Sequence, residues 1–222
     1  MRNPWLDIPL ADYEGHMALP AVAQADLLAD VLTSLLEQYA PPSVAVLGCA
    51  GGNGFDRISP AVTDRVVGMD INPNFIDATR VRFQGRFRSL ELLVGDLQIE
   101  AFSVEPVDFL YAALVFEYLD LSAAWRSIRS LLRPGAVVGT VVQLPTDGFD
   151  AVTRSTYPSV QALAPSMRLV SPVELRDSAG HDAEELNAYS VDSRAGKQFQ
   201  VQVFRFNAAR DASGDAIRRR SD

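Results

Sequence analysis

Residues 44–56 read V-A-V-L-G-C-A-G-G-N-G-F-D and join a short apolar run to a glycine-rich loop. A β-branched apolar run bounded by turn residues is typical of a buried strand. Glycines allow a tight turn and a close approach of the backbone to a ligand. A helix that begins after such a loop offers free N–H groups to the anionic parts of a ligand. The stretch therefore predicts a strand, a ligand-binding turn and a helix in immediate succession.

A second predicted strand, residues 65–70, ends in a carboxylate, Asp70. In nucleotide-binding α/β folds, an acidic residue about 20 residues beyond the glycine loop receives ribose hydroxyls. The distance along the chain from the loop to Asp70 fits this pattern. The two stretches together predict a nucleoside-containing cofactor at the carboxyl ends of a parallel sheet.

The overall composition is that of an ordinary globular chain. Of 222 residues, 48% are hydrophobic and 22% are charged, enough for one large domain with a full core. A net charge of −8 and a pI of about 4.8 argue against nucleic acid as a partner, because phosphate binding usually needs a basic face. No run is long enough to span a bilayer, and the N-terminus lacks the apolar core of a signal peptide, so we expect a cytoplasmic protein without membrane partners.

Two residue counts narrow the chemistry. Cys49 is the only cysteine, which excludes an intrachain disulfide, a cysteine-based zinc site and an iron–sulfur cluster, and no metal site is predicted. Lys197 is the only lysine among 20 basic residues. A P-loop NTPase is excluded because no lysine follows the glycine loop.

The order of the predicted elements indicates an α/β fold. Helices are expected at residues 21–39, 74–84, 122–132 and 172–179, with a short helix after the glycine loop. Strands are expected at residues 44–47, 65–70, 90–94, 107–114, 136–143, 185–191 and 198–206. Alternation of strand and helix through the fifth strand favours a doubly wound parallel sheet, and the last two strands form a hairpin that places one of them antiparallel.

Three segments flank this sheet. Residues 1–40 are expected to form an arm and a helix packed on the core, with residues 1–20 irregular but too apolar for a solvated tail. Residues 145–171 read as a substrate-side insert in a cofactor-binding domain of residues 41–207. Residues 208–222 lose apolar periodicity and are expected to be disordered.

The chain resembles the class I S-adenosylmethionine-dependent methyltransferases over residues 40–207. The matching pieces lie in order at 44–54, G-M-D at 68–70, G-D-L at 95–97, residues 112–119, L-R-P-G at 132–135 and the terminal hairpin. The resemblance implies S-adenosylmethionine as cofactor and a Rossmann-like, doubly wound, mostly parallel seven-stranded sheet. In that fold the antiparallel C-terminal strand, here residues 198–206, inserts between the fifth and sixth strands.

By this resemblance, the glycine loop would lie against the methionine part of the cofactor. The loop residues concerned are Gly48, Cys49, Ala50, Gly52 and Asn53. Ala50 stands where the family has a glycine, and Val46 stands where the family often has an acidic residue. The contact of that acidic residue with the cofactor's amino group would have to come from Asp12, Glu14 or water.

The remaining implied contacts lie at the ends of the next strands. Asp70 would accept the ribose hydroxyls, and Ile71 would flank the adenine. Asp96 would accept from the adenine amino group, beside the backbone N–H of Leu97. The pocket wall at the end of the fourth strand would be formed by Ala112 and Ala113.

Methyl transfer from a sulfonium is an in-line displacement with an activated leaving group, so alignment and desolvation are the protein's main tasks. A general base is needed only where the acceptor must lose a proton. The sequence identifies no base, and the candidates near the expected mouth are Glu117, Tyr118, Tyr13 and His16. The Asn/Asp-Pro-Pro-Tyr motif, which by resemblance would imply methylation of amino groups of bases or glutamine, is missing after the fourth strand. Because the chain is acidic and the arm and the insert can close over a pocket, we expect a small-molecule acceptor under a lid formed by these two segments.

Two alternatives stand beside this interpretation. Gly48, Gly52 and Gly54 also satisfy the Gly-x-x-x-Gly-x-Gly loop of nicotinamide-dependent short-chain reductases. The Tyr-x-x-x-Lys of that family is impossible here, because Ser193 stands four residues before the only lysine. The other alternative is a methyltransferase-like protein that binds the cofactor or a partner without turnover.

Overall fold

The computed structural model describes residues 3–207, so the disorder predicted for residues 208–222 lies outside the described part of the chain. Seven strands form one sheet in the order β3-β2-β1-β4-β5-β7-β6. The strands are β1 (Ser43–Leu47), β2 (Arg65–Asp70), β3 (Ser89–Val94), β4 (Val107–Ala113), β5 (Leu132–Gln143), β6 (Ala183–Asp192) and β7 (Gln198–Phe206). Strands β1 to β5 pair in parallel, and β7 is antiparallel to both β5 and β6. The predicted fold class is confirmed, with residues 198–206 in the predicted place.

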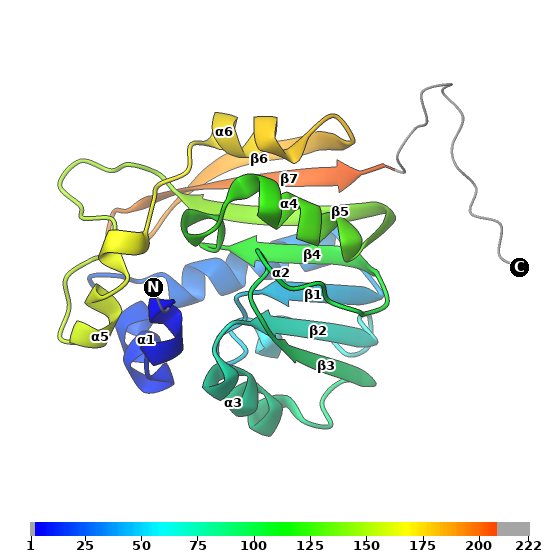
Figure 1. Ribbon diagram of the computed structural model, residues 1–222, viewed down its shortest axis with the longest axis horizontal. Helices are drawn as coiled ribbons and strands as arrows, with labels where there is room; N and C mark the ends of the chain where they lie inside the picture. The colour runs from blue at the N-terminus through cyan, green and yellow to red at the C-terminus, as the bar shows by residue number, and fades with distance from the viewer. Residues whose placement is uncertain (1–2, 208–222) are drawn as a thin grey trace, which may run out of the picture.

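Helices cover both faces of this sheet (Figure 1). The α-helices of residues 3–207 are α1 (Leu10–Ala18), α2 (Ala25–Tyr39), α3 (Pro73–Phe83), α4 (Leu121–Ser130), α5 (Pro158–Gln161) and α6 (Pro172–Ala179). Helices α4 and α6 share one core cluster with β4, β5 and β7, whereas α2 and α3 belong to the cluster on the opposite face. Within residues 3–207, no helix combines the length and apolarity that crossing a membrane requires.

Strand β7 lies between β5 and β6 and is buried on both faces of the sheet. Phe199, Val201 and Val203 point into the cluster under α2. Phe204 and Phe206 point to the other face, where both rings lie against Trp125 of α4, with centroids 5.7 Å and 5.6 Å away. A strand covered on both faces is fixed in register by its own apolar pattern, because a one-residue slip would exchange the two sets.

Three expectations about local structure are corrected. The arm is helical rather than irregular, with a 3-10 turn at Pro4–Asp7 followed by α1. Residues 95–106, between β3 and β4, contain turns and no helix, so strand and helix do not alternate strictly. The short helix expected after the glycine loop is a single 3-10 turn, Phe55–Arg57.

The arm was wrongly predicted to be irregular because its prolines were taken to exclude a helix. Pro4 occupies the first turn of the 3-10 segment, and Pro9 directly precedes α1, which are positions where a missing N–H costs little. Gly15 lies inside α1, where a Cβ would come within 2.4 Å of the Tyr157 hydroxyl oxygen. Because Gly15 has no side chain, the insert can pack closely against the arm. Helices α1 and α5 lie together beyond the carboxyl ends of the parallel strands (Figure 1).

Candidate functional site

A cavity lies at the carboxyl ends of the parallel strands, between the sheet, the arm and the insert. It holds about 1120 Å³ of empty space, part of which is open solvent. Its wall includes seven of the eleven predicted cofactor residues: Gly48, Ala50, Asp70, Ile71, Asp96, Leu97 and Ala113. The strand ends therefore bring together residues that the sequence separates by more than sixty positions.

The glycine loop enters the cavity at two positions with left-handed backbone. Gly48 has φ +60°, and a Cβ there would meet Val115 Cγ2 at 2.9 Å, so side chains are excluded both by conformation and by space. Ala50 has φ +48° and keeps this conformation as a non-glycine residue. Its N–H donates to Asp70 Oδ2 at 2.9 Å, which holds the loop against the end of β2.

Asp70 is a buried carboxylate that the backbone orients. Besides Ala50, the N–H of Asn72 donates to it, to Oδ1 at 2.9 Å. Burial raises the pKa of Asp70 to about 6, against the opposing effect of these backbone hydrogen bonds. A ligand that donates further hydrogen bonds to Asp70 would favour its charged form.

The turn after β3 offers a second pair of polar groups. Asp96 Oδ1 accepts from the N–H of Gln98 at 2.9 Å. Among residues 3–207, Asp96 Oδ2 and the Leu97 N–H have no hydrogen-bond partner, and both residues line the cavity. One free acceptor beside one free donor matches the edge of an adenine ring.

The other four predicted cofactor residues do not line the cavity. Cys49 is fully buried beneath the loop, where burial raises the pKa of its thiol, and Ala112 is buried in the core. Gly52 turns towards α3, where a Cβ would lie 2.3 Å from a ring atom of Phe83. Asn53 is exposed, and its Nδ2 donates to the Tyr13 hydroxyl at 3.5 Å. Cys49 and Gly52 therefore pack around the turn of the loop and do not form the cavity wall.

Neither acidic residue considered as a substitute at Val46 reaches the cavity. The Ser159 hydroxyl of the insert donates to Asp12 at 2.5 Å. Glu14 forms a bidentate ion pair with Arg82 of α3. Both carboxylates therefore hold α1 in place, the first to the insert and the second to the core.

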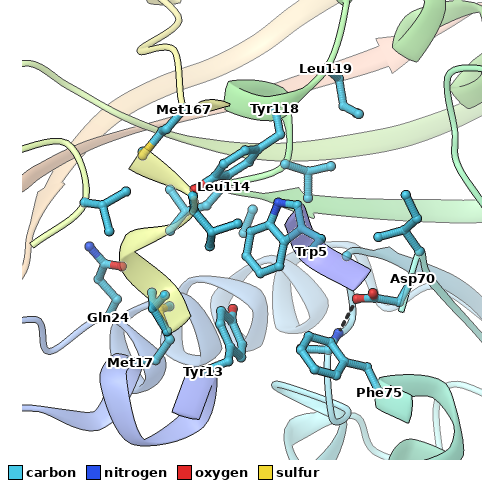
Figure 2. A pocket seen from close by; sticks show the side chains of 18 of the residues that line it. Trp5, Tyr13, Met17, Gln24, Asp70, Phe75, Leu114, Tyr118, Leu119 and Met167 are labelled. Carbon is cyan, nitrogen blue, oxygen red and sulfur yellow. Dashed lines mark hydrogen bonds between the residues drawn. The ribbon is translucent and has the colours of Figure 1, made fainter. Parts of the chain in front are cut away.

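Three of the four candidate bases line the cavity, and an aromatic group connects two of them. The Trp5 ring meets Tyr13 at 5.7 Å and Tyr118 at 5.1 Å between centroids, both edge to face. Figure 2 shows the three rings around the cavity, with Trp5 on the side of Asp70. Burial raises the pKa of both tyrosines, so their hydroxyls stay protonated at neutral pH. His16 Nδ1 lies 2.8 Å from the Ser155 hydroxyl, and burial lowers the pKa of its imidazole.

The fourth candidate, Glu117, is buried behind the cavity and does not line it. Its Oε1 accepts from the Gln143 N–H at 2.8 Å. Its Oε2 is buried with no hydrogen-bond partner in the described part of the chain. Burial raises the pKa of Glu117 to about 7. This carboxyl group cannot take a proton from a ligand in the cavity as the chain is arranged here.

Sequence reasoning missed the half of the cavity that lies away from the glycine loop. The wall at that end comes from Met17, Gln24, Gln143, Val152, Val160, Leu163, Met167 and Lys197, and elsewhere the wall also includes Asn3, Phe75 and Leu114. The one signal that could have indicated this half was the rarity of lysine, because Lys197 is 1% exposed. Leu114 gave no signal, although its φ of +56° places a strained residue directly after β4.

The strand order and the cavity at the strand ends define a methyltransferase fold of class I. The model of a family described as a methyltransferase domain matches residues 45–140. Together with the fold, this match confirms the predicted resemblance to the class I S-adenosylmethionine-dependent methyltransferases. No curated protein matches the chain by sequence.

Solved structures share the fold at low sequence identity. N-methyltransferase NodS from Bradyrhizobium japonicum WM9, bound to S-adenosyl-l-homocysteine, is 16% identical, with a TM-score of 0.62 over 82% of this chain and 87% of that one. Magnesium protoporphyrin IX methyltransferase ChlM from Synechocystis PCC 6803 is 15% identical, with a TM-score of 0.63 over 84% of each chain. The [4+2]-cyclase SpnF is 13% identical, with a TM-score of 0.63 over 81% of each chain.

Proposed function

We propose that this protein transfers the methyl group of S-adenosylmethionine to a small-molecule acceptor held in the cavity. One observation carries the proposal: seven of the eleven predicted cofactor residues share a single cavity with residues of the arm and the insert. The cofactor supplies a methyl group already activated on a sulfonium. The chain's residues would bind both molecules, align them and exclude water.

The cofactor half of the cavity fits the nucleoside. Asp70 would accept the ribose hydroxyls, which favour the charged carboxylate that burial alone disfavours. Asp96 Oδ2 and the Leu97 N–H would meet the adenine edge, and both groups are free for it among the described residues. Gly48 allows the ligand to approach the backbone, since its left-handed φ and the nearby Val115 leave no room for a side chain.

Residues 1–40 and the insert at 145–171 would form the lid over the domain of residues 41–207. Trp5, Tyr13 and Tyr118 meet edge to face over the cavity, where aromatic rings exclude water and attract a cationic sulfonium. The Asn72 side chain donates to the carbonyl of Trp5 at 2.9 Å and to that of Ile8 at 3.3 Å, which fastens the arm to the start of α3.

His16 is the candidate base that fits best if the acceptor must lose a proton. It lines the cavity, and its lowered pKa leaves a neutral imidazole at pH 7. The pKa values of Tyr13 and Tyr118 are raised, so neither hydroxyl is available as a base. A small acceptor is supported by the closed wall of arm and insert, and the structurally similar ChlM is a methyltransferase of one small molecule, magnesium protoporphyrin IX.

Calorimetric titration tests the proposal directly. S-adenosylmethionine, its demethylated product and NADPH are titrated into the purified protein. We expect micromolar binding of the first two and no heat from NADPH. Limited proteolysis should then show protection of the arm and the insert when the demethylated product and an acceptor are both bound. Binding of NADPH alone, or of none of the three, would overturn the proposal.

A further inference from the structure

The cavity end remote from the glycine loop contains the chain's only lysine. Lys197 directly precedes β7, lines the cavity and is 1% exposed. Its Nζ donates to the Ala151 carbonyl at 2.8 Å and, over a long 3.4 Å, to Gln143 Oε1. An ammonium group has three donors, and both of these acceptors are uncharged, so at least one N–H remains for a ligand.

Among residues 3–207, no carboxylate forms an ion pair with this buried cation. Asp150 is the one acidic residue that raises its pKa, but Asp150 is exposed and pairs with Arg154 at 3.3 Å. Burial dominates and lowers the pKa of Lys197 to about 8. The charge of Lys197 also contributes to the lowered pKa of His16, which faces the same cavity from α1. A buried charge without a partner is costly, and an anion at this end would remove that cost.

The residues around Lys197 indicate the chemistry of the rest of a ligand bound at this end. The apolar part of the wall at this end comes from the arm and the insert: Met17, Val152, Val160, Leu163 and Met167. Gln24 also lines the cavity and adds a polar amide to this wall. Figure 2 shows Gln24, Met17 and Met167 on the side of the cavity away from Asp70. A molecule that fits here is largely hydrophobic and carries one acidic group.

We propose that Lys197 binds the carboxylate of a hydrophobic methyl acceptor. That this ligand is the methyl acceptor rests on the proposed methyl transfer, whereas the binding of a carboxylate by Lys197 does not depend on it. Strand β7 lies two places from β4 in the sheet, which corresponds to roughly 10 Å. An acid of the size of a substituted phenylacetate therefore spans from Lys197 to the end of β4, where the methyl group is expected. The carboxylate is an anchor at this site, and no bond to it is made or broken.

The competing explanation is structural: Lys197 could serve only to fix the insert through Ala151 and the end of β5 through Gln143. The two explanations differ in what a carboxylate does. An anchor responds to a carboxylate and ignores the isosteric amide, whereas a structural lysine responds to neither.

The single lysine allows a direct test by NMR. Protein labelled with [13Cε]lysine should give one lysine signal, whose pH titration reports the protonation of Lys197. We expect phenylacetate to move the titration midpoint upward by about one unit, which corresponds to a tenfold linkage, and phenylacetamide to leave it in place. An unchanged midpoint at saturating phenylacetate, or equal effects of both probes, would overturn the proposal.

Variants provide the second readout. Lys197→Met should weaken phenylacetate binding at pH 7 at least tenfold, and Lys197→Arg should retain most of it. Arg194→Met is the matched control, because it removes an exposed cation from the same loop, and it should leave phenylacetate binding unchanged. Equal weakening by Lys197→Met and Arg194→Met would contradict the site. If Lys197→Met does not fold, the wild-type titration alone decides. Titration of S-adenosylmethionine is separate, so failure of the methyl-transfer proposal leaves this result interpretable.

Discussion

The two ends of the cavity are built in different ways. At the cofactor end, Gly48, Asp70 and Asp96 each lie directly at the end of a strand. At the other end, the wall comes from helix α1, the insert and Lys197, which are far apart in the sequence. Under the proposed function, the comparison teaches that the nucleoside would bind mainly at the strand ends, whereas the acceptor would bind to a wall that exists only after the arm and the insert have packed.

Each end of the cavity also buries one ionisable side chain, and the two side chains, of opposite charge, differ in their hydrogen bonds. Asp70 accepts two backbone N–H groups at 2.9 Å, and those hydrogen bonds oppose the effect of burial on its pKa. Lys197 has one short hydrogen bond to a carbonyl and one long one to an amide. The carboxylate is therefore oriented before a ligand arrives, and the ammonium is the group that gains most from an oppositely charged ligand.

The largest effect is expected behind the acceptor end, at Glu117. Its folded-state pKa of about 7 lies above the ordinary value of 4.5, so the folded state loses stability as the pH rises from about 4.5 to about 7. Glu117→Gln should therefore raise the free energy of unfolding by about 3 kcal/mol at pH 8 and by less than about 1 kcal/mol at pH 5. Urea denaturation at both pH values measures this.

Glu37→Gln is the control for that prediction, because Glu37 is exposed on α2. It should change stability at neither pH. A gain of equal size at pH 5 and pH 8 for Glu117→Gln would show that titration of this carboxyl group is not the cause.

An intermediate effect is expected at the cofactor end. Asp70→Ala should weaken binding of S-adenosylmethionine by about 1–3 kcal/mol, because the ribose hydroxyls would lose their buried acceptor. Asp70→Asn keeps one acceptor oxygen and should lose less. Calorimetry gives the dissociation constants. Asp64→Ala, at the opposite end of β2 and exposed, is the matched control, and an equal loss in that variant would reject the ribose role.

The smallest effect tests how the arm connects the two ends. Glu14→Gln weakens the ion pair with Arg82, whose partners are 32% and 44% exposed. Exposed pairs contribute at most about 1 kcal/mol, so we expect a loss of affinity for S-adenosylmethionine of about fivefold or less and faster proteolysis of the arm. Asp77→Asn weakens the exposed Asp77–Arg80 pair on the same helix α3 and should change neither. Arm cleavage at the wild-type rate in Glu14→Gln would show that this pair does not hold the arm.

The sequence predicted the sheet better than the cavity, for physical reasons. Residues 172–179 and 198–206 were predicted with their observed bounds, because Ser171 caps the helix and the strand alternates cleanly. The glycine loop and Asp70 were predicted from their spacing at strand ends, and the other expected cofactor contacts were implied by the family resemblance. Trp5 and Gln24 could not be predicted, and Lys197 only through its rarity, because a side chain comes to face a cavity through contacts with residues distant in the sequence. The arm was misjudged because proline positions were read without the helix starts that they permit.

Helix α1 is fastened on both sides of the cavity. Glu14 holds it to α3, while Asp12 and His16 hold it to Ser159 and Ser155 of the insert. Opening the cofactor side therefore pulls on the acceptor side through one rigid piece of chain. The consequence concerns the kinetic order of turnover: the two molecules should not load independently, and release of the demethylated cofactor should be slowed while product still holds the insert closed.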